Sequence, residues 1–331
     1  MVNSGGSSYV RVAYEGELFE RIAGSLGDLS GIERFSLVDE GWAAVLASSL
    51  SAVDFCRLAS RFGDESEAPV WKNLMGTLGA VDRLLEGSSR EGLQAFVRQL
   101  AGPALERIGW DAQEGESDLD RDLRGTLVRS LGILGRDPEV IGRAVELESR
   151  SRAGEHVDGP LAAAAITVAA SVGDEELRQT YAALYRDGDT PQVQRRYMQA
   201  LAAFPDQDQM ERSLELAVDG YVRSQDHFAL VGSCIANREH GVFAWNFTKE
   251  HWDKLIAQLT AHLRTYMIEP VRLLSTPELR DDVTAFFAEH PIPRAEKGLA
   301  HVLERQEVAV SLRKREAANL QAAFAPGGEL S

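Results

Sequence analysis

Helix signals recur along almost the entire sequence and restrict the fold more than any other feature. Phe35, Val38, Trp42 and Leu46 follow one another at intervals of three and four residues. This spacing places the four side chains on one face of a helix, as in an amphipathic helix that packs against a core. Similar apolar series continue through the chain, so the sequence predicts an all-α fold.

Residues that cap the first turn mark many of the expected helix starts. Ser51 and Asp54 form a pair resembling a capping box, in which side-chain oxygens accept otherwise unpaired N–H groups. Proline at the first helical position loses no hydrogen bond, because that N–H has no helical acceptor. Three sites place a capping residue before such a proline: Asp137-Pro138, Thr190-Pro191 and Thr276-Pro277.

Short breaks separate these helices, at residues 63–66, 186–189 and 204–206. Short loops imply antiparallel neighbouring helices, and many such hairpins in one chain usually stack as a curved solenoid. No strict repeat period is present. No low-complexity linker is present either, so we expect one helical domain over residues 15–324, followed by a disordered tail at 325–331. The acidic segment 111–122 is interpreted as a solvated loop.

Residues 9–14 are the exception to the helical pattern. The segment Y-V-R-V-A-Y is short, partly alternating and rich in aromatic and β-branched residues, which is typical of a β-strand. A single strand cannot satisfy its own backbone hydrogen bonds, and no other segment reads clearly as its partner. We therefore interpret residues 1–14 as the remnant of the last strand of a preceding β-domain.

Charge and cysteine content limit the partners and the compartment. The formal net charge of −16 repels phosphates and anionic lipid, so we expect neither nucleic acid nor a membrane as a partner. The longest apolar stretch, residues 161–170, is too short to cross a bilayer. The only cysteines, Cys56 and Cys234, lie far apart in sequence, which favours a reducing, cytoplasmic compartment.

The chain lacks the sequence motifs of common catalytic centres. A zinc peptidase needs two histidines one helical turn apart and a carboxylate that activates the metal-bound water. No two histidines here are spaced that way, and no H-E-x-x-H occurs; the histidines are His156, His227, His240, His251, His262, His290 and His301. No G-x-S-x-G elbow, phosphate-binding loop or dinucleotide fingerprint occurs either. We expect no catalytic residue and no cofactor in this chain.

Several ordered segments resemble the C-terminal part of aminopeptidase N-type zinc metallopeptidases, including the endoplasmic reticulum aminopeptidases. The clearest resemblance is at residues 222–226, 244–247 and 251–252, which read V-R-S-Q-D, A-W-N-F and H-W. They are similar to the family's R-x-Q-D, A-W-x-F and N-W, with His251 in place of asparagine. Residues taken to be structural members of the family's motifs are Arg11, Tyr14, Trp110, Asp226, Trp245 and Trp252.

The resemblance implies a bowl-shaped α-solenoid of HEAT-like helical hairpins that covers a thermolysin-like catalytic domain. In the family, the zinc ligands, the catalytic glutamate and the G-A-M-E-N loop lie upstream of this region. The implied role is non-catalytic: the domain encloses the peptide-binding chamber and contacts the distal part of the substrate. The implied partners are the parent's catalytic domain and peptide substrates, and zinc belongs to the parent.

A peptide in such a chamber presents a C-terminal carboxylate, which the planar fork of a guanidinium can bond through both oxygens. Arg223 and Arg124 are candidates for that contact, although Arg223 and Asp226 are spaced to form an ion pair along a helix instead. Further candidates for peptide contact are Arg196, Tyr197 and Gln225. The tryptophans Trp245 and Trp252 are seven residues apart and are expected in the core between helices.

A second function is also compatible with the sequence. Helical repeats commonly present concave surfaces to proteins, so the chain could be a free-standing scaffold for protein partners. A parent reading frame without an upstream H-E-x-x-H would favour this alternative over the aminopeptidase domain.

Overall fold

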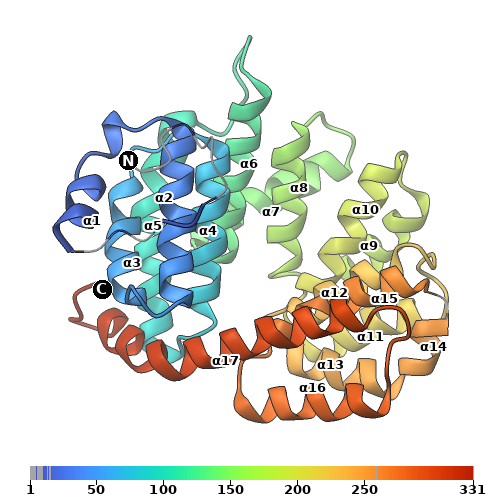
Figure 1. Ribbon diagram of the computed structural model, residues 1–331. Coiled ribbons are helices and arrows are strands. Elements are labelled where there is room, and N and C mark those ends of the chain that lie inside the picture. The colour runs from blue at the N-terminus through green and yellow to red at the C-terminus, as the bar shows by residue number, and fades with distance from the viewer. Residues whose placement is uncertain (1–4, 6–9, 13, 15, 258, 331) are drawn as a thin grey trace. The chain divides into compact units, whose positions relative to one another are not determined.

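The computed structural model of the 331-residue chain describes residues 5, 10–12, 14, 16–257 and 259–330. Figure 1 shows helices joined by short loops, and no strand occurs among these residues. The prediction of an all-α fold is confirmed. The described helices are also too short or too polar to cross a membrane.

The α-helices follow one another with few long connections, and short 3-10 turns (η) extend several of them. The α-helices are α1 (Gly16–Ala23), α2 (Gly31–Leu46), α3 (Ala52–Ala59), α4 (Ala68–Asp82), α5 (Gly87–Ile108), α6 (Asp118–Ile133), α7 (Pro138–Arg152), α8 (Gly159–Ala170), α9 (Glu175–Asp187), α10 (Pro191–Ala200), α11 (Gln207–Val218), α12 (His227–Ala236), α13 (Gly241–Glu250), α14 (Trp252–Ala257), α15 (Ala261–Ile268), α16 (Pro277–Glu289) and α17 (Glu296–Phe324). The 3-10 turns are η2 (Leu26–Asp28), η3 (Ser60–Phe62), η4 (Leu201–Ala203) and η5 (Glu269–Leu273).

The capping residues expected from the sequence begin the helices as predicted. The Ser51 hydroxyl accepts a hydrogen bond from the Asp54 N–H at 3.0 Å at the start of α3. The side chains of Asp137, Thr190 and Thr276 likewise accept N–H groups in the first turns of α7, α10 and α16. Each of these three residues is followed by proline at the first helical position. These side chains satisfy backbone donors that have no acceptor within the helix. Local sequence therefore fixes where these helices begin.

The chain divides into two compact units where the sequence predicts a single domain. Unit 1 contains residues 1–168 and 314–331, and unit 2 contains residues 169–313. In unit 1, α5 packs on α6, α2 and α6 both pack on α4, and α6 packs on α7. In unit 2, α9 packs on α10, and α12 packs on α11, α13 and α15. Within each unit most packing joins near neighbours in sequence, which is compatible with helical hairpins.

The C-terminal end of α17 belongs to the core of unit 1. The Glu316 carboxylate accepts the N–H of Ala52 at 3.0 Å, and the Phe324 ring lies 5.7 Å from the Phe96 ring. Residues 325–330, expected to be disordered, form turns after α17. The N–H of Leu330 bonds the carbonyl of Ala323 at 2.9 Å. This bond uses a carbonyl that the end of the helix leaves without a helical partner.

The N-terminal segment differs from the predicted strand. Tyr9 and Ala13 lie outside the described residues, and Val10–Val12 and Tyr14 are not in a strand. The N–H of Val12 donates instead to the Glu40 carboxylate of α2 at 2.8 Å, and Arg11 pairs with Asp39. In the described part of the chain this segment has no strand to pair with, so side chains of α2 satisfy its polar groups.

Candidate functional site

The turn that joins α11 to α12, residues 219–226, carries the R-S-Q-D motif. Val222 anchors the turn: its side chain is buried, and its N–H bonds the carbonyl of Leu216 in α11 at 2.9 Å. The next residues, Arg223 and Gln225, have exposed side chains. Asp226 ends the turn just before the first residue of α12. A buried anchor therefore holds two exposed polar side chains at the surface of unit 2.

Tyr185, near the end of α9, ties this turn to the neighbouring helix. Its ring is buried, and its hydroxyl accepts the N–H of Arg223 at 3.0 Å and donates to the Asp226 carboxylate at 3.2 Å. Burial raises the pKa of the Tyr185 phenol, and the negative charge of Asp226 acts in the same direction. The hydroxyl therefore stays protonated and remains a donor to Asp226.

The Arg223 guanidinium is positioned without a carboxylate partner among the described residues. Its Nη2 donates to Oε1 of Gln194 at 2.6 Å, and its central carbon, Cζ, lies 5.8 Å from the centre of the Tyr185 ring. Gln194 is oriented in turn by donating to the carbonyl of Gly188 at 2.8 Å. The guanidinium is thus held by a neutral amide and an aromatic face, which leaves it available to an external anion.

A second cation, at the end of α9, packs against this turn. The Arg186 guanidinium packs 4.8 Å from the centre of the Tyr221 ring and donates to the Tyr221 carbonyl at 3.4 Å. The hydroxyl of Tyr221 bonds the carbonyl of Ala182 at 3.1 Å, which fixes the ring against α9. The end of α9 and the 219–226 turn thus present two arginines supported by aromatic rings. This arrangement suits binding of a carboxylate or another anion and offers no acid–base or nucleophilic centre.

The other residues predicted for peptide contact lie in different environments. Tyr197 is buried in α10 with its ring 4.9 Å from that of Tyr181, so it belongs to the helix packing. Arg196 is half-buried on the same helix, and Gln225 is exposed beside Arg223. Of this predicted set, the structure brings Gln225 and Arg223 together on one turn and places Tyr197 in the core.

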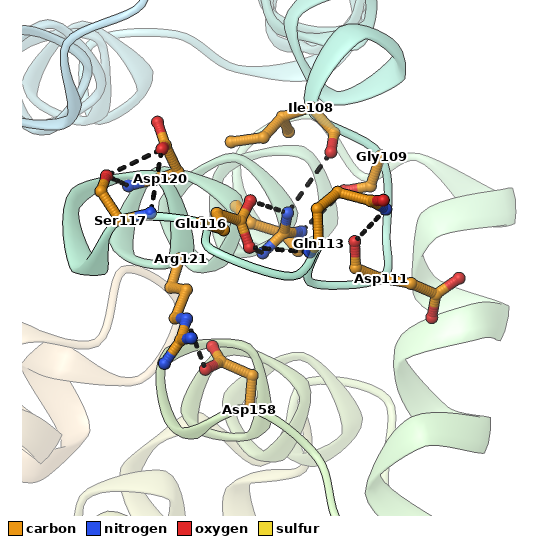
Figure 2. A network of polar contacts seen from close by, with 10 residues as sticks. Ile108, Gly109, Asp111, Gln113, Glu116, Ser117, Asp120, Arg121 and Asp158 are labelled. Atoms are coloured by element: carbon orange, nitrogen blue, oxygen red, sulfur yellow. Dashed lines mark hydrogen bonds and ion pairs between the residues drawn. The ribbon is translucent and has the colours of Figure 1, made fainter.

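Arg124 is fully buried in α6 and holds the loop between α5 and α6. Figure 2 labels its partners in this loop region, Ile108, Gly109 and Glu116. Its guanidinium forms a bidentate pair with the Glu116 carboxylate, with Nη1 at 3.0 Å from Oε2. Nε donates to the carbonyl of Gly109 at 2.8 Å, and Nη2 donates to the carbonyl of Ile108 at 3.3 Å. All three nitrogens are therefore used within unit 1, so in this structure the side chain does not reach a peptide.

This geometry also corrects the interpretation of the acidic segment 111–122 as a solvated loop. Residues 118–122 form the first turns of α6, and the Glu116 side chain is 7% exposed beneath the loop. The hydrogen bond from Arg124 lowers the pKa of the Glu116 carboxyl below its usual range. One of the acidic residues therefore serves as the counterion of a buried cation and not as a solvated charge.

The described residues contain no group of three or more His, Cys, Asp or Glu side chains arranged to hold a metal ion. Both cysteines are buried and free, and burial raises the pKa of the Cys56 thiol to about 12. A thiol held in its protonated form is a poor nucleophile.

Comparison with known proteins identifies the family. The model of the ERAP1-like C-terminal domain matches residues 1–308. The chain belongs to this family.

Relatives of this ERAP1-like C-terminal domain are aminopeptidases from plants and yeast. Aminopeptidase M1-A of Oryza sativa subsp. japonica is 28% identical over 319 residues, which cover 93% of this chain and 36% of the relative. Aminopeptidase M1 of Arabidopsis thaliana is 25% identical over 325 residues, with the same coverage of each chain. Aminopeptidase 2, mitochondrial, of Saccharomyces cerevisiae is 24% identical over 314 residues, covering 92% and 33%. The chain spans about a third of the length of these relatives.

The residues that resemble the family's motifs make contacts within the domain. The Trp245 ring is buried, and its Nε1 donates to Asp282 of α16 at 2.7 Å. Trp252 packs edge-on against Phe286 of the same helix at 5.3 Å, so both tryptophans are core residues. The half-buried Trp110 carries the Arg143 guanidinium 4.5 Å above its ring. Trp245 and Trp252, from two separate motifs, therefore pack against the same helix, α16.

No sequence motif pointed to four residues that support the R-S-Q-D turn: Tyr185, Arg186 and Gln194 beside it, and Tyr221 within it. Their contacts with the turn, or with one another, join residues 29 to 41 positions apart in the chain. No local spacing pattern reports a pairing of that kind. The tyrosine and arginine at 185–186 could be found only once α9 was known to pack beside the turn.

Proposed function

We propose that this chain is the non-catalytic C-terminal domain of a zinc aminopeptidase. In that role it encloses the peptide-binding chamber and contacts the distal part of peptide substrates. The observation that carries the proposal is the family match over residues 1–308, together with relatives that are aminopeptidases about three times as long.

The chemistry of the R-S-Q-D turn supports a role in peptide contact. The C-terminus of a peptide is a carboxylate, and Arg223 offers it an exposed guanidinium without a carboxylate partner among the described residues. Arg186, at the end of α9, adds a second positive charge beside the turn, and the exposed amide of Gln225 can bond peptide backbone groups. We assign the distal end of the substrate to this turn.

Zinc chemistry is assigned to the parent's catalytic domain. The described residues here do not fit a zinc site, because no suitable set of three ligands comes together. No catalytic step is therefore assigned to this chain. Its contribution to turnover would be to admit, orient and enclose the peptide, as mobile covers of active sites do.

A cytoplasmic location is part of the proposal. It rests on two free, buried cysteines, a pattern typical of proteins kept in a reducing compartment. The yeast relative is named as mitochondrial, and that location is a property of the yeast protein.

The proposal is tested with Arg223→Gln introduced into the parent enzyme. We expect KM for peptides of about ten residues to rise roughly tenfold, because one charge-assisted hydrogen bond to the substrate is lost. The kcat for the same peptides and all constants for aminoacyl amides should stay unchanged, because an amide has no distal end.

The matched control is Arg195→Gln, which removes one exposed positive charge from α10, next to the turn. This variant should behave as the unmodified enzyme does. Equal effects of the two substitutions would mean that KM responds to the net charge of this surface and not to Arg223 itself. An unchanged KM for long peptides in Arg223→Gln would refute the assignment of the turn.

A further inference from the structure

Unit 2 contains an open pocket of about 750 Å³ that none of the sequence motifs indicates. One wall comes from α15 and η5 and includes Tyr266 and Glu269. The opposite wall comes from the loop before α17, with Arg294, and from the first turns of α17, with Val302 and Arg305. These elements are labelled α15 and α17 in Figure 1. The volume lies in the range of small-molecule sites.

The two walls of this pocket meet where Gly298 of α17 packs against Thr265 of α15. A Cβ atom on Gly298 would lie 2.7 Å from the Thr265 side chain. A larger residue at position 298 would therefore force that side chain to shift. The position of one wall relative to the other thus depends on packing within unit 2.

Arg294 occupies the pocket wall at a conformational cost. Its φ of 69° lies in the left-handed region, which disfavours residues other than glycine, asparagine and aspartate. Prolines at 291 and 293 restrict the loop, and the N–H of Arg294 donates to the Glu296 carboxylate at 3.0 Å. Such strain persists where the surrounding structure enforces it and is concentrated at functional sites. The loop thus holds an arginine where glycine would be less costly.

The charged groups around the pocket leave the Arg294 side chain available to bind a ligand. The carboxylate of Glu269 is already shared by Arg305 at 2.9 Å and Arg272 at 3.3 Å. Arg294 forms no ion pair within the described part of the chain, and its side chain is exposed. A protein with a net charge of −16 therefore presents a locally positive pocket. An anion is the ligand that this charge distribution attracts.

Besides these charged residues, Thr265 and His301, the rest of the pocket lining is apolar or aromatic. Tyr266 is 52% exposed, and Ala295 and Val302 contribute apolar atoms to the lining. We propose that this pocket binds an organic carboxylate that carries an apolar group, with Arg294 contacting the carboxylate. The shared chemistry is an apolar carboxylate, which a free small molecule or the C-terminal residue of a peptide can supply. The proposal concerns a site apart from the 219–226 turn and does not depend on the chain's role in an aminopeptidase.

The test uses the 331-residue chain and hydrocinnamate as the probe, with binding measured by ligand-observed NMR. Hydrocinnamamide has nearly the same shape and no charge, so it reports the contribution of the carboxylate. We expect hydrocinnamate to bind with a Kd on the order of 1 mM, as befits so small a ligand, and the amide to bind at least tenfold more weakly. N-acetyl-alanyl-phenylalanine and its amide form a second arm that represents the peptide source.

Arg294→Gly is the decisive variant, because glycine accepts the left-handed backbone and should leave the fold intact. We expect it to weaken hydrocinnamate binding about ten- to hundredfold through loss of a charge-assisted hydrogen bond. Lys297→Gln is the matched control: it removes one exposed positive charge from the first turn of α17, outside the pocket lining, and should bind normally. Circular dichroism confirms that each variant is folded.

Binding of either carboxylate that is lost in Arg294→Gly and kept in Lys297→Gln supports the site, and the tighter of the two probes identifies the source. The proposal is overturned if neither carboxylate shows binding at a probe concentration of about ten times the expected Kd. It is also overturned if each amide binds as well as its acid, or if Arg294→Gly binds as the unmodified chain does.

Discussion

Replacing Arg124 with methionine should destabilise unit 1 more than any exposed charge change. Methionine is shorter than arginine, unbranched and apolar, so it fills part of the space while removing the positive charge. Glu116 would then be left as a carboxylate under the loop, 7% exposed and without its counterion. The carbonyls of Ile108 and Gly109 would also lose their donor.

The size of the effect follows from these contacts. Removing one partner of a buried ion pair costs about 3–5 kcal/mol, and we take about 3 kcal/mol because Glu116 retains some contact with water. An unfolding entropy of about 2.1 cal/mol/K per residue gives roughly 0.4 kcal/mol/K for a unit of about 190 residues. Arg124→Met should therefore lower the Tm of unit 1 by about 8 °C.

The assay is thermal unfolding followed by circular dichroism and calorimetry at neutral pH, with two further variants. Arg150→Met removes an exposed partner of Glu155 in the same unit and should change Tm little. Arg124→Met combined with Glu116→Leu should recover part of the loss, because no unpaired charge remains, but not all of it, because the two carbonyls stay without a donor. An Arg124→Met chain that melts within about 2 °C of the unmodified chain would show that the pair of Arg124 and Glu116 does not stabilise unit 1 as proposed.

Two further predictions concern packing and pH. Gly125→Ala should destabilise the chain by about 1–3 kcal/mol, because the new Cβ would lie 2.7 Å from the carbonyl oxygen of Pro160. Gly142→Ala should not destabilise it, because a Cβ at that position would have no neighbour within 4 Å. Thermal unfolding of both variants tests this prediction. His227 is buried, its Nε2 bonds the carbonyl of Leu255 at 3.2 Å, and burial lowers its pKa. Because the unfolded state then binds more protons, stability should be complete above about pH 6.5 and fall as the pH drops below it; a His227→Gln chain with the same pH profile of Tm would contradict this.

The helical fold could be predicted from the sequence because its signals are local. Capping residues such as Ser51 and Thr276 act on N–H groups two or three positions away, so their effect can be read from neighbours alone. The core position of Trp245 followed from helical spacing in the same way. The 9–14 strand was predicted from side-chain type, but a strand also needs a partner, and the described residues offer none.

The candidate site was predictable only in part, because its contacts join distant segments. Arg223 was found through its motif, but the expected ion pair with Asp226 does not form. Asp226 precedes α12 and accepts a hydrogen bond from the Tyr185 hydroxyl, whereas Arg223 donates to Gln194. These two hydrogen bonds depend on how α9 and α10 pack beside the turn. The pocket near Arg294 was not foreseen for the same reason, since its walls are about 30 residues apart in sequence.

We propose that this chain shapes access to a catalytic domain and has no peptidase activity of its own. The most direct measurement compares hydrolysis of an aminoacyl amide and of a peptide of about ten residues. It uses the parent's upstream portion with zinc, this chain with zinc, and the two mixed. Our account predicts no turnover by this chain alone, and a change in kcat/KM on mixing that is larger for the peptide than for the amide. Zinc-dependent turnover by this chain alone, or an equal change for both substrates, would contradict it.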